Sequence, residues 1–174
     1  MSLILLIDGY NVVAPIAPPG RVRDPRWLQR ERNQLVSRLV QHLDAEIRNR
    51  TCLVFDAANP PPDRPSEFDA EGIHVRFAIG YPEADDLLEE IIAAHSAPKN
   101  LAVVSSDHRV QAAARRRGSQ IFDAQSWLDD LIDGRIRLAP TQLGGAGQGS
   151  QTEGDKPDAI DDDDVQRWMN EFGY

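Results

Sequence analysis

The sequence contains little cysteine, little lysine and no long apolar run, and each shortage excludes a class of protein. Cys52 is the only cysteine among 174 residues, which excludes a disulfide scaffold and a cysteine-based zinc site. The longest apolar runs span a handful of residues, so no transmembrane helix is expected. The first residues carry no basic region and reach Asp8 too early for a signal peptide. We therefore expect a cytoplasmic protein that does not bind membranes.

Charge is unevenly distributed along the chain. The net charge is −9, and residues 140–174, with two basic and eight acidic residues, carry −6 of it. Residues 1–139 carry only −3. All of the 19 basic residues except Lys99 and Lys156 are arginines, whose forked donors fit phosphate groups. Arginine-rich codon usage in a GC-rich genome explains the same bias equally well.

Apolar runs alternate with helical patterns, which predicts an α/β fold with a mostly parallel sheet of about five strands and right-handed crossovers. The expected strands cover residues 3–7, 51–55, 73–78, 101–105 and 120–122. The expected helices cover residues 25–49, a segment that opens at 82–86, and residues 106–117 and 124–133. Residues 57–69 contain three consecutive prolines and are expected to form a loop.

The composition changes after about residue 139. We predict one domain over residues 1–139, a flexible acidic linker over 140–160 and a short amphipathic segment over 161–174. In this last segment four apolar side chains share one helical face, namely Val165, Trp168, Met169 and Phe172. The segment could fold back on its own domain or dock on a protein partner as a helix, and the sequence leaves both open.

Acidic residues follow the predicted strands at the points where the strands end. Asp8 follows the first strand, Asp56 the second and Asp107 the fourth, while Asp85 and Asp86 open the helix after the third. In an open parallel sheet these positions meet at one edge, where ligands bind. Crowded carboxylates repel one another, and a divalent cation such as Mg²⁺ or Mn²⁺ removes the conflict. Such an ion activates water for attack on a phosphate.

Each acid also has a purely structural interpretation. Helix capping alone could explain Asp107, and complementing a helix dipole alone could explain Asp85 and Asp86. Asp8 is harder to explain in this way, because an unbroken apolar strand delivers it directly to the sheet edge. The combination is therefore more specific than any single member.

Polar and aromatic residues accompany these acids. Asn11, Ser105 and Ser106 could hydrogen-bond a metal ligand or a phosphate, although Asn11 could equally form an Asx turn. Tyr10 and Tyr81 could stack on bases, although tyrosines more often pack half-buried.

Several arginines are placed where they could hold an RNA backbone, among them Arg23, Arg76 and Arg109. His108 adjoins Asp107 and is a weak acid–base candidate. The chain lacks a glycine-rich dinucleotide-binding turn after the first strand and lacks a P-loop. These absences exclude two common classes of α/β nucleotide-binding protein.

Four motifs together resemble the NYN domain, and most closely its YacP-like branch in the PIN-like nuclease superfamily. They are residues 5–12 (LLIDGYNV), 54–57 (VFDA), 84–86 (ADD) and 105–107 (SSD). The resemblance covers about residues 3–137. It implies a three-layer α/β/α fold and a metal-dependent endoribonuclease that cleaves RNA phosphodiester bonds with a metal-activated water.

The resemblance also implies roles for single residues. Asp8, Asp85 and Asp107 match the family's acidic catalytic and metal-binding positions, and Asp56 is expected to join them as a metal ligand. Asn11 and Ser106 match polar positions beside the site. The YacP-like branch further implies a bacterial, cytoplasmic setting with links to mRNA and ribosomes.

A second hypothesis is a non-catalytic adaptor that keeps the fold and binds RNA or the ribosome without cutting. The slight negative charge of residues 1–139 departs from the basic surface of many RNA-binding domains. Local arginines must then bind phosphate, or the ribosome must supply much of the affinity.

Overall fold

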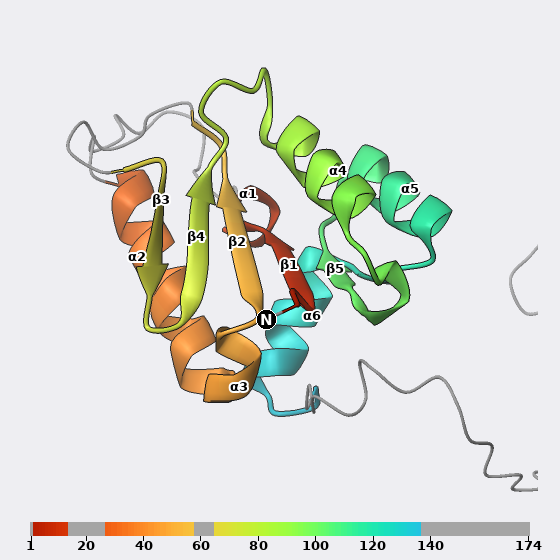
Figure 1. Ribbon diagram of the computed structural model, residues 1–174. Coiled ribbons are helices and arrows are strands. Elements are labelled where there is room, and N and C mark those ends of the chain that lie inside the picture. Colours follow the sequence, from red (N-terminus) through yellow and green to blue (C-terminus); the bar gives the residue numbers. More distant parts are fainter. Residues whose placement is uncertain (1, 14–26, 58–64, 137–174) are drawn as a thin grey trace, which may run out of the picture.

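The computed structural model describes residues 2–13, 27–57 and 65–136, which build a six-stranded sheet with helices (Figure 1). The strands are β1 (Leu5–Asp8), β2 (Thr51–Phe55), β3 (Glu67–Ala70), β4 (Ile73–Phe77), β5 (Ala102–Val104) and β6 (Gln120–Phe122). The helices are α1 (Gly9–Val12), α2 (Trp27–His42), α3 (Ala45–Arg48), α4 (Ala84–Ala94), α5 (His108–Arg117) and α6 (Ala124–Ile132), with a 3₁₀ turn at Pro98–Asn100.

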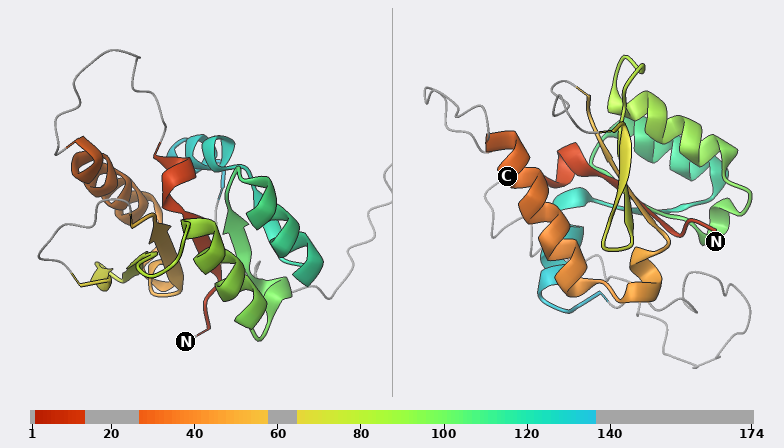
Figure 2. Two further views of the ribbon diagram at one scale, coloured as in Figure 1. Left: turned by 90° about the horizontal axis from the view of Figure 1, so that it is seen from above. Right: turned by 60° about the vertical axis from the view of Figure 1, so that its left-hand side comes forward.

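The strand order is β3-β4-β2-β1-β5-β6, and only the β3–β4 pair is antiparallel. The sheet separates two hydrophobic cores. One lies under α2, α3 and α6, and the other lies under α4 and α5. Figure 2 shows the α4–α5 pair and α2 on opposite sides of the sheet. In β1, Leu5 and Ile7 enter the first core and Leu6 enters the second. The predicted three-layer α/β/α fold is thus confirmed.

Two predicted boundaries were wrong. The segment expected to be a loop over residues 57–69 contains β3 at its end, which forms a hairpin with β4 through Glu71 and Gly72. The single helix expected over residues 25–49 is divided into α2 and α3, because Asp44 takes an extended conformation between them. Leu43 and Ile47 are both buried on either side of this break, so the apolar periodicity continues although the helix does not.

The remaining predicted elements lie close to where the sequence placed them. Helix α5 ends at Gly118, whose φ of 76° is the left-handed conformation that glycine favours at a helix end. None of the described helices is long and apolar enough to cross a membrane. Arg23, the predicted linker and the segment with Trp168 lie outside the described residues.

Candidate active site

Asp8 ends the central strand β1 and is buried, with 2% of its surface exposed. The pairing of Ile7 with Val104 brings the following residues, Asp8 and Ser105, side by side at the carboxyl edge. Ser105 Oγ donates to Asp8 Oδ2 at 2.8 Å, and the backbone N–H of Asn11 donates to Oδ1 at 3.3 Å. The Asn11 side-chain amide also donates to Oδ2. Three donors therefore fix the orientation of a desolvated carboxylate.

The local backbone around Asp8 depends on a glycine. A Cβ added at Gly9 would lie 2.4 Å from Cε1 of Phe55 and 2.9 Å from the carbonyl oxygen of Val54. Only glycine therefore lets α1 start against β2 directly after Asp8. The far end of α1 is held by Gln125 of α6, whose side-chain amide donates to the carbonyl oxygen of Asn11 at 3.2 Å.

Asp107 lies at the start of α5 and caps it. Its Oδ1 accepts the backbone N–H of Arg109 at 2.7 Å and of Val110 at 3.3 Å. Its own N–H donates to Ser105 Oγ at 3.0 Å, which links Asp107 to the group around Asp8. The capping interpretation is thus correct, and both capping bonds go to the same carboxylate oxygen, Oδ1.

Asp85 lies half-buried in the first turn of α4. Burial, followed by the negative charges of Asp107 and Asp8, raises its pKa from 3.8 to about 6. The structure therefore places Asp85 of α4 within electrostatic range of Asp8, at the end of β1, and of Asp107, at the start of α5. These oxygen ligands are of the kind that Mg²⁺ and Mn²⁺ prefer.

The carboxylates are close enough to repel one another but are not preset for a shared ion. Within residues 2–13, 27–57 and 65–136, no group of three or more His, Cys, Asp or Glu side chains is positioned to hold a metal. The donor chemistry fits a hard divalent cation. Since Mg²⁺ usually keeps several waters and takes one or two carboxylates, a preset cage is not required for binding.

Asp86 and Arg109 form a clasp between α4 and α5. The Arg109 guanidinium bonds Glu83 at 3.1 Å, Asp86 at 2.9 Å and Glu89 at 3.1 Å, all on α4 or its cap. Asp86 also accepts the backbone N–H of Glu83 at 3.3 Å in a capping box. All three nitrogens of Arg109 thus contact carboxylates, and its contact with RNA phosphate stays a prediction.

Asp56 follows β2 but lies against α2. Its carbonyl oxygen accepts a hydrogen bond from Arg32 Nη2 at 3.2 Å. Burial lowers the pKa of Arg32, and the negative charge of Asp56 opposes that shift. The Arg32 guanidinium lies 5.3 Å and 5.1 Å from the ring centres of Phe55 and Phe77. The main charges that raise the pKa of Asp85 are those of Asp107 and Asp8, and the role of Asp56 as a metal ligand stays a prediction.

Sequence reasoning missed Arg32, although a signal was present. Arg32 lies three residues before Leu35 on the stripe that continues through Leu39 and Leu43. A basic residue on the buried face of a helix needs a partner. The position of Arg32 on this face therefore predicts that its guanidinium contacts an acidic or aromatic side chain near the sheet.

Ser106 and Arg76 have contacts away from Asp8. Ser106 Oγ donates to Asp123 at 2.6 Å and accepts the N–H of Ala124 at 3.1 Å, so it supports the start of α6 and lowers the pKa of Asp123. Arg76 lies 3.6 Å from Glu67. Their contacts with RNA stay predictions, and Arg23 is outside the described ranges.

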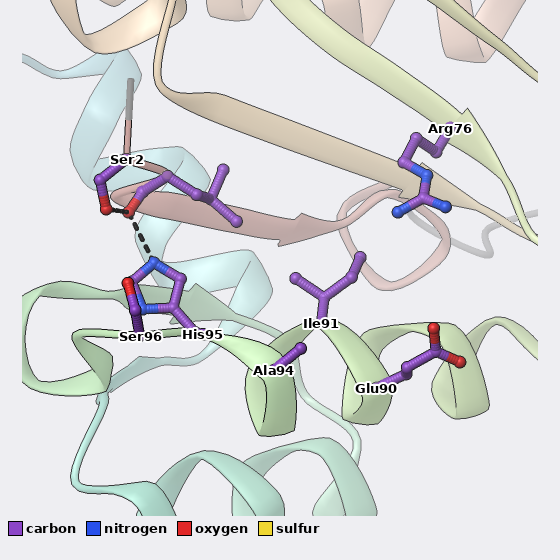
Figure 3. Close-up of a pocket in the computed structure, with 8 residues that line it drawn as sticks. Ser2, Arg76, Glu90, Ile91, Ala94, His95 and Ser96 are labelled. Carbon is purple, nitrogen blue, oxygen red and sulfur yellow. Dashed lines mark hydrogen bonds between the residues drawn. The ribbon is translucent and has the colours of Figure 1, made fainter.

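Arg76 also lines a hollow of about 430 Å³ between β4, α4 and the first residues (Figure 3). His95 borders the same hollow. Its Nδ1 accepts the N–H of Ala97 at 3.2 Å, so Nε2 donates to the carbonyl oxygen of Leu3 at 2.9 Å. This histidine therefore ties the N-terminal segment to the end of α4. His108, in contrast, is exposed at the start of α5.

Comparisons with known proteins bear on the family and the fold. The sequence model of the YacP-like NYN domain matches residues 5–170. The crystal structure of Rae1 (YacP) from Bacillus subtilis is similar at 23% identity and a TM-score of 0.54, over 78% of this chain and 77% of that one. A single-substitution variant of the same protein gives 23% and 0.51, over 78% and 79%. A search of curated proteins found no match.

The family match extends further than the sequence motifs did. The motifs support a resemblance over about residues 3–137, whereas the match continues to residue 170 and includes Trp168. The predicted acidic linker over residues 140–160 thus lies within the part of the chain that the family model matches.

Proposed function

Because the chain belongs to the YacP-like NYN domain family, a family of nuclease-like domains, we propose that it is a divalent-metal-dependent endoribonuclease. The observation that supports this most is the grouping of Asp8, Asp85 and Asp107 at the carboxyl edge. Burial, followed by the negative charges of Asp107 and Asp8, raises the pKa of Asp85 to about 6. A fold gains no stability from such a grouping, and perturbed acids of this kind are common at active sites.

Asp8, Asp85 and Asp107 would hold Mg²⁺ or Mn²⁺. When bound, the ion supplies an activated water and neutralises charge on the phosphate. Asn11 and Ser105 keep the Asp8 carboxylate oriented through their hydrogen bonds, as partners of metal ligands generally do. Asp85, with its pKa near 6, gives up its proton readily at neutral pH and then presents a full negative charge to a cation. Asp107 keeps its position because it also caps α5.

The alternative is a non-catalytic adaptor that binds RNA or the ribosome with the same fold. It is favoured by one observation, namely that the described residues contain no group of three or more His, Cys, Asp or Glu side chains positioned to hold an ion. An adaptor would bind RNA with an affinity that falls as salt rises, and would leave it intact.

Incubation of labelled single-stranded RNA with purified protein separates these functions. The nuclease is expected to cleave in Mn²⁺ or Mg²⁺ and to be inactive in excess EDTA. Asp8→Asn is expected to abolish cleavage while the circular dichroism spectrum is retained. The control is Asp44→Asn, since Asp44 is exposed and precedes β2 at the opposite edge. Full activity of Asp8→Asn, or full activity in EDTA, would reject the mechanism.

We extend the proposal to a cytoplasmic setting in which the RNA is mRNA on the ribosome. The net charge of −3 over residues 1–139 supplies little attraction for free RNA, so a larger assembly would have to provide affinity. Co-sedimentation of the protein with ribosomes in a sucrose gradient tests this. Recovery only in the ribosome-free fractions would contradict it without affecting cleavage of free RNA.

A further inference from the structure

Tyr10 is a large aromatic side chain that the fold leaves exposed beside the carboxylates. It is 58% exposed and lies in α1, two residues after the buried Asp8. The other large hydrophobic side chains exposed in the described ranges are Ile79 and Ile132. Tyr10 and Ile79 both follow strands that end at the carboxyl edge. Exposed apolar surface therefore accompanies the acidic group on the same rim.

The backbone that carries Tyr10 is held on several sides. Asp8 accepts the N–H of Asn11, and Gln125 of α6 donates to the Asn11 carbonyl oxygen. Gly9 approaches β2 so closely that no Cβ would fit against Phe55. An exposed ring on a fixed backbone is preorganised for a flat ligand, because little conformational freedom is lost when the ligand binds.

Tyr81, the other tyrosine near this edge, is engaged differently. Its hydroxyl donates to Glu90 at 2.8 Å, and its half-buried ring packs against the core under α4. The sequence did not distinguish the two tyrosines, but in the structure their rings differ in how accessible they are to a ligand. Only Tyr10 presents more than half of its surface to solvent next to Asp8.

We propose that the Tyr10 ring stacks on one base of single-stranded RNA, next to the phosphate at which the proposed cleavage takes place. This rests on the proposed RNA-directed function. Both faces of a base inside a duplex are covered by its neighbours, so a Tyr10 stack needs an unpaired base. Every base offers a π-face. Tyr10 therefore contributes affinity and the register of the strand rather than a choice of sequence.

The test combines Tyr10 variants with RNA that lacks single bases. Labelled single-stranded RNAs, each with one abasic residue at a successive position, are given to the wild type, Tyr10→Phe, Tyr10→Ala and the control Ile132→Ala. Ile132 is also exposed but lies at the far end of α6. Both kcat/KM for cleavage and Kd by fluorescence anisotropy are measured, with melting temperatures to verify folding.

At one abasic position the kcat/KM of the wild type is expected to fall about 10-fold, and its Kd to rise about 10-fold. Tyr10→Ala is expected to show that loss already on intact RNA and no further loss at that position. Tyr10→Phe and Ile132→Ala should behave as the wild type. Equal constants for Tyr10→Ala and the wild type on intact RNA, or an abasic penalty that Tyr10→Ala retains, would overturn the proposal.

Failure of the nuclease proposal gives a different pattern. If the wild type binds RNA without cleaving it, the catalytic function fails, and the Kd values alone decide whether Tyr10 stacks on a base. If the wild type neither cleaves nor binds single-stranded RNA, both proposals are rejected.

Discussion

At the scale of single residues, Asp85 shows the conflict between stability and function most clearly. Its ionised form is disfavoured by burial and by the charges of Asp107 and Asp8. The folded pKa of about 6 lies above the ordinary value of 3.8, so between these pH values the native state binds more protons than the unfolded state. The stability contributed by Asp85 is therefore present at low pH and is lost as the pH rises from about 4 to 6.

The variant Asp85→Asn tests this conflict. In metal-free buffer at pH 7 it is expected to melt above the wild type, by on the order of 2 °C. The difference should shrink as the pH is lowered from 6 to 4, since the wild type then becomes protonated. Addition of Mg²⁺ or Mn²⁺ should raise the melting temperature of the wild type and not that of the variant.

Asp44→Asn is the matched control for this experiment, because Asp44 is exposed and asparagine caps helices equally well. It should melt as the wild type does at each pH and each metal concentration. A difference between Asp85→Asn and the wild type that does not change with pH would contradict the assigned electrostatic cause.

The residues at the site could be predicted only in part. The sheet-edge rule identified Asp8, Asp85 and Asp107, because a carboxylate after a buried strand or in the next helix turn must lie at that edge. The rule does not say which distant side chains compete for a carboxylate. Asp56 has the same sequence context as Asp8, yet Arg32 of α2 donates to its backbone carbonyl oxygen and interacts with its negative charge.

At the scale of elements, the clasp between α4 and α5 positions the site. Arg109 lies two residues after Asp107, and its partners Glu83 and Asp86 flank Asp85. The two helices also share the core that contains Leu88. Separate surface ion pairs add little stability. One guanidinium that bonds three carboxylates instead restricts how the first turn of α4 moves relative to α5.

Variants of Arg109 are expected to loosen that first turn. Arg109→Gln should increase hydrogen exchange of the α4 amides around residues 85–90 several-fold, because local opening becomes easier. Arg109→Lys should rescue this only partly, since an ammonium group cannot bond three carboxylates as the guanidinium fork does. Exchange is followed by mass spectrometry of peptides from this region.

Arg115→Gln is the control for the clasp. Arg115 is exposed in the last turn of the same helix and donates only to Gln111 in the described structure. Its substitution should leave exchange in α4 unchanged. Full rescue by Arg109→Lys would show that charge alone, and not the geometry of the fork, restricts α4.

Element types were more predictable than element ends. Unbroken apolar runs identified β1, β2 and β5, because strands buried on both faces need no polar alternation. The break at Asp44 was hidden by the buried pair Leu43 and Ile47, which preserves a helical period across it. Strand β3 was missed because it is a short edge strand after a proline-rich segment, and only Phe68 and Ala70 are partly buried in it.

At the scale of the whole molecule, the described residues form a three-layer unit. Both cores are filled by side chains from residues 4–131, and every strand has a neighbour in the sheet. The role of the acidic C-terminal segment stays a prediction. Trp168 and the apolar residues around it could pack on this unit or dock on a partner.

Removal of all residues after 139 tests whether the C-terminal segment packs on its own domain or docks on a partner. Since the buried side chains of both described cores come from residues 4–131, the truncated protein is expected to melt within about 2 °C of the full chain, which would favour docking on a partner. A fall of more than about 5 °C would instead show that the segment packs on its own domain. Differential scanning calorimetry of both chains at one pH and salt concentration gives the comparison.

We propose that Asp8, Asp85 and Asp107 share one divalent cation. The most direct test is a crystal of the full chain soaked in Mn²⁺, with an anomalous difference map recorded at the manganese edge. We expect a peak within coordination distance of these three carboxylates, and its loss in Asp85→Asn crystals. A map without a peak there at saturating Mn²⁺, or with the ion bound by other side chains, would contradict it.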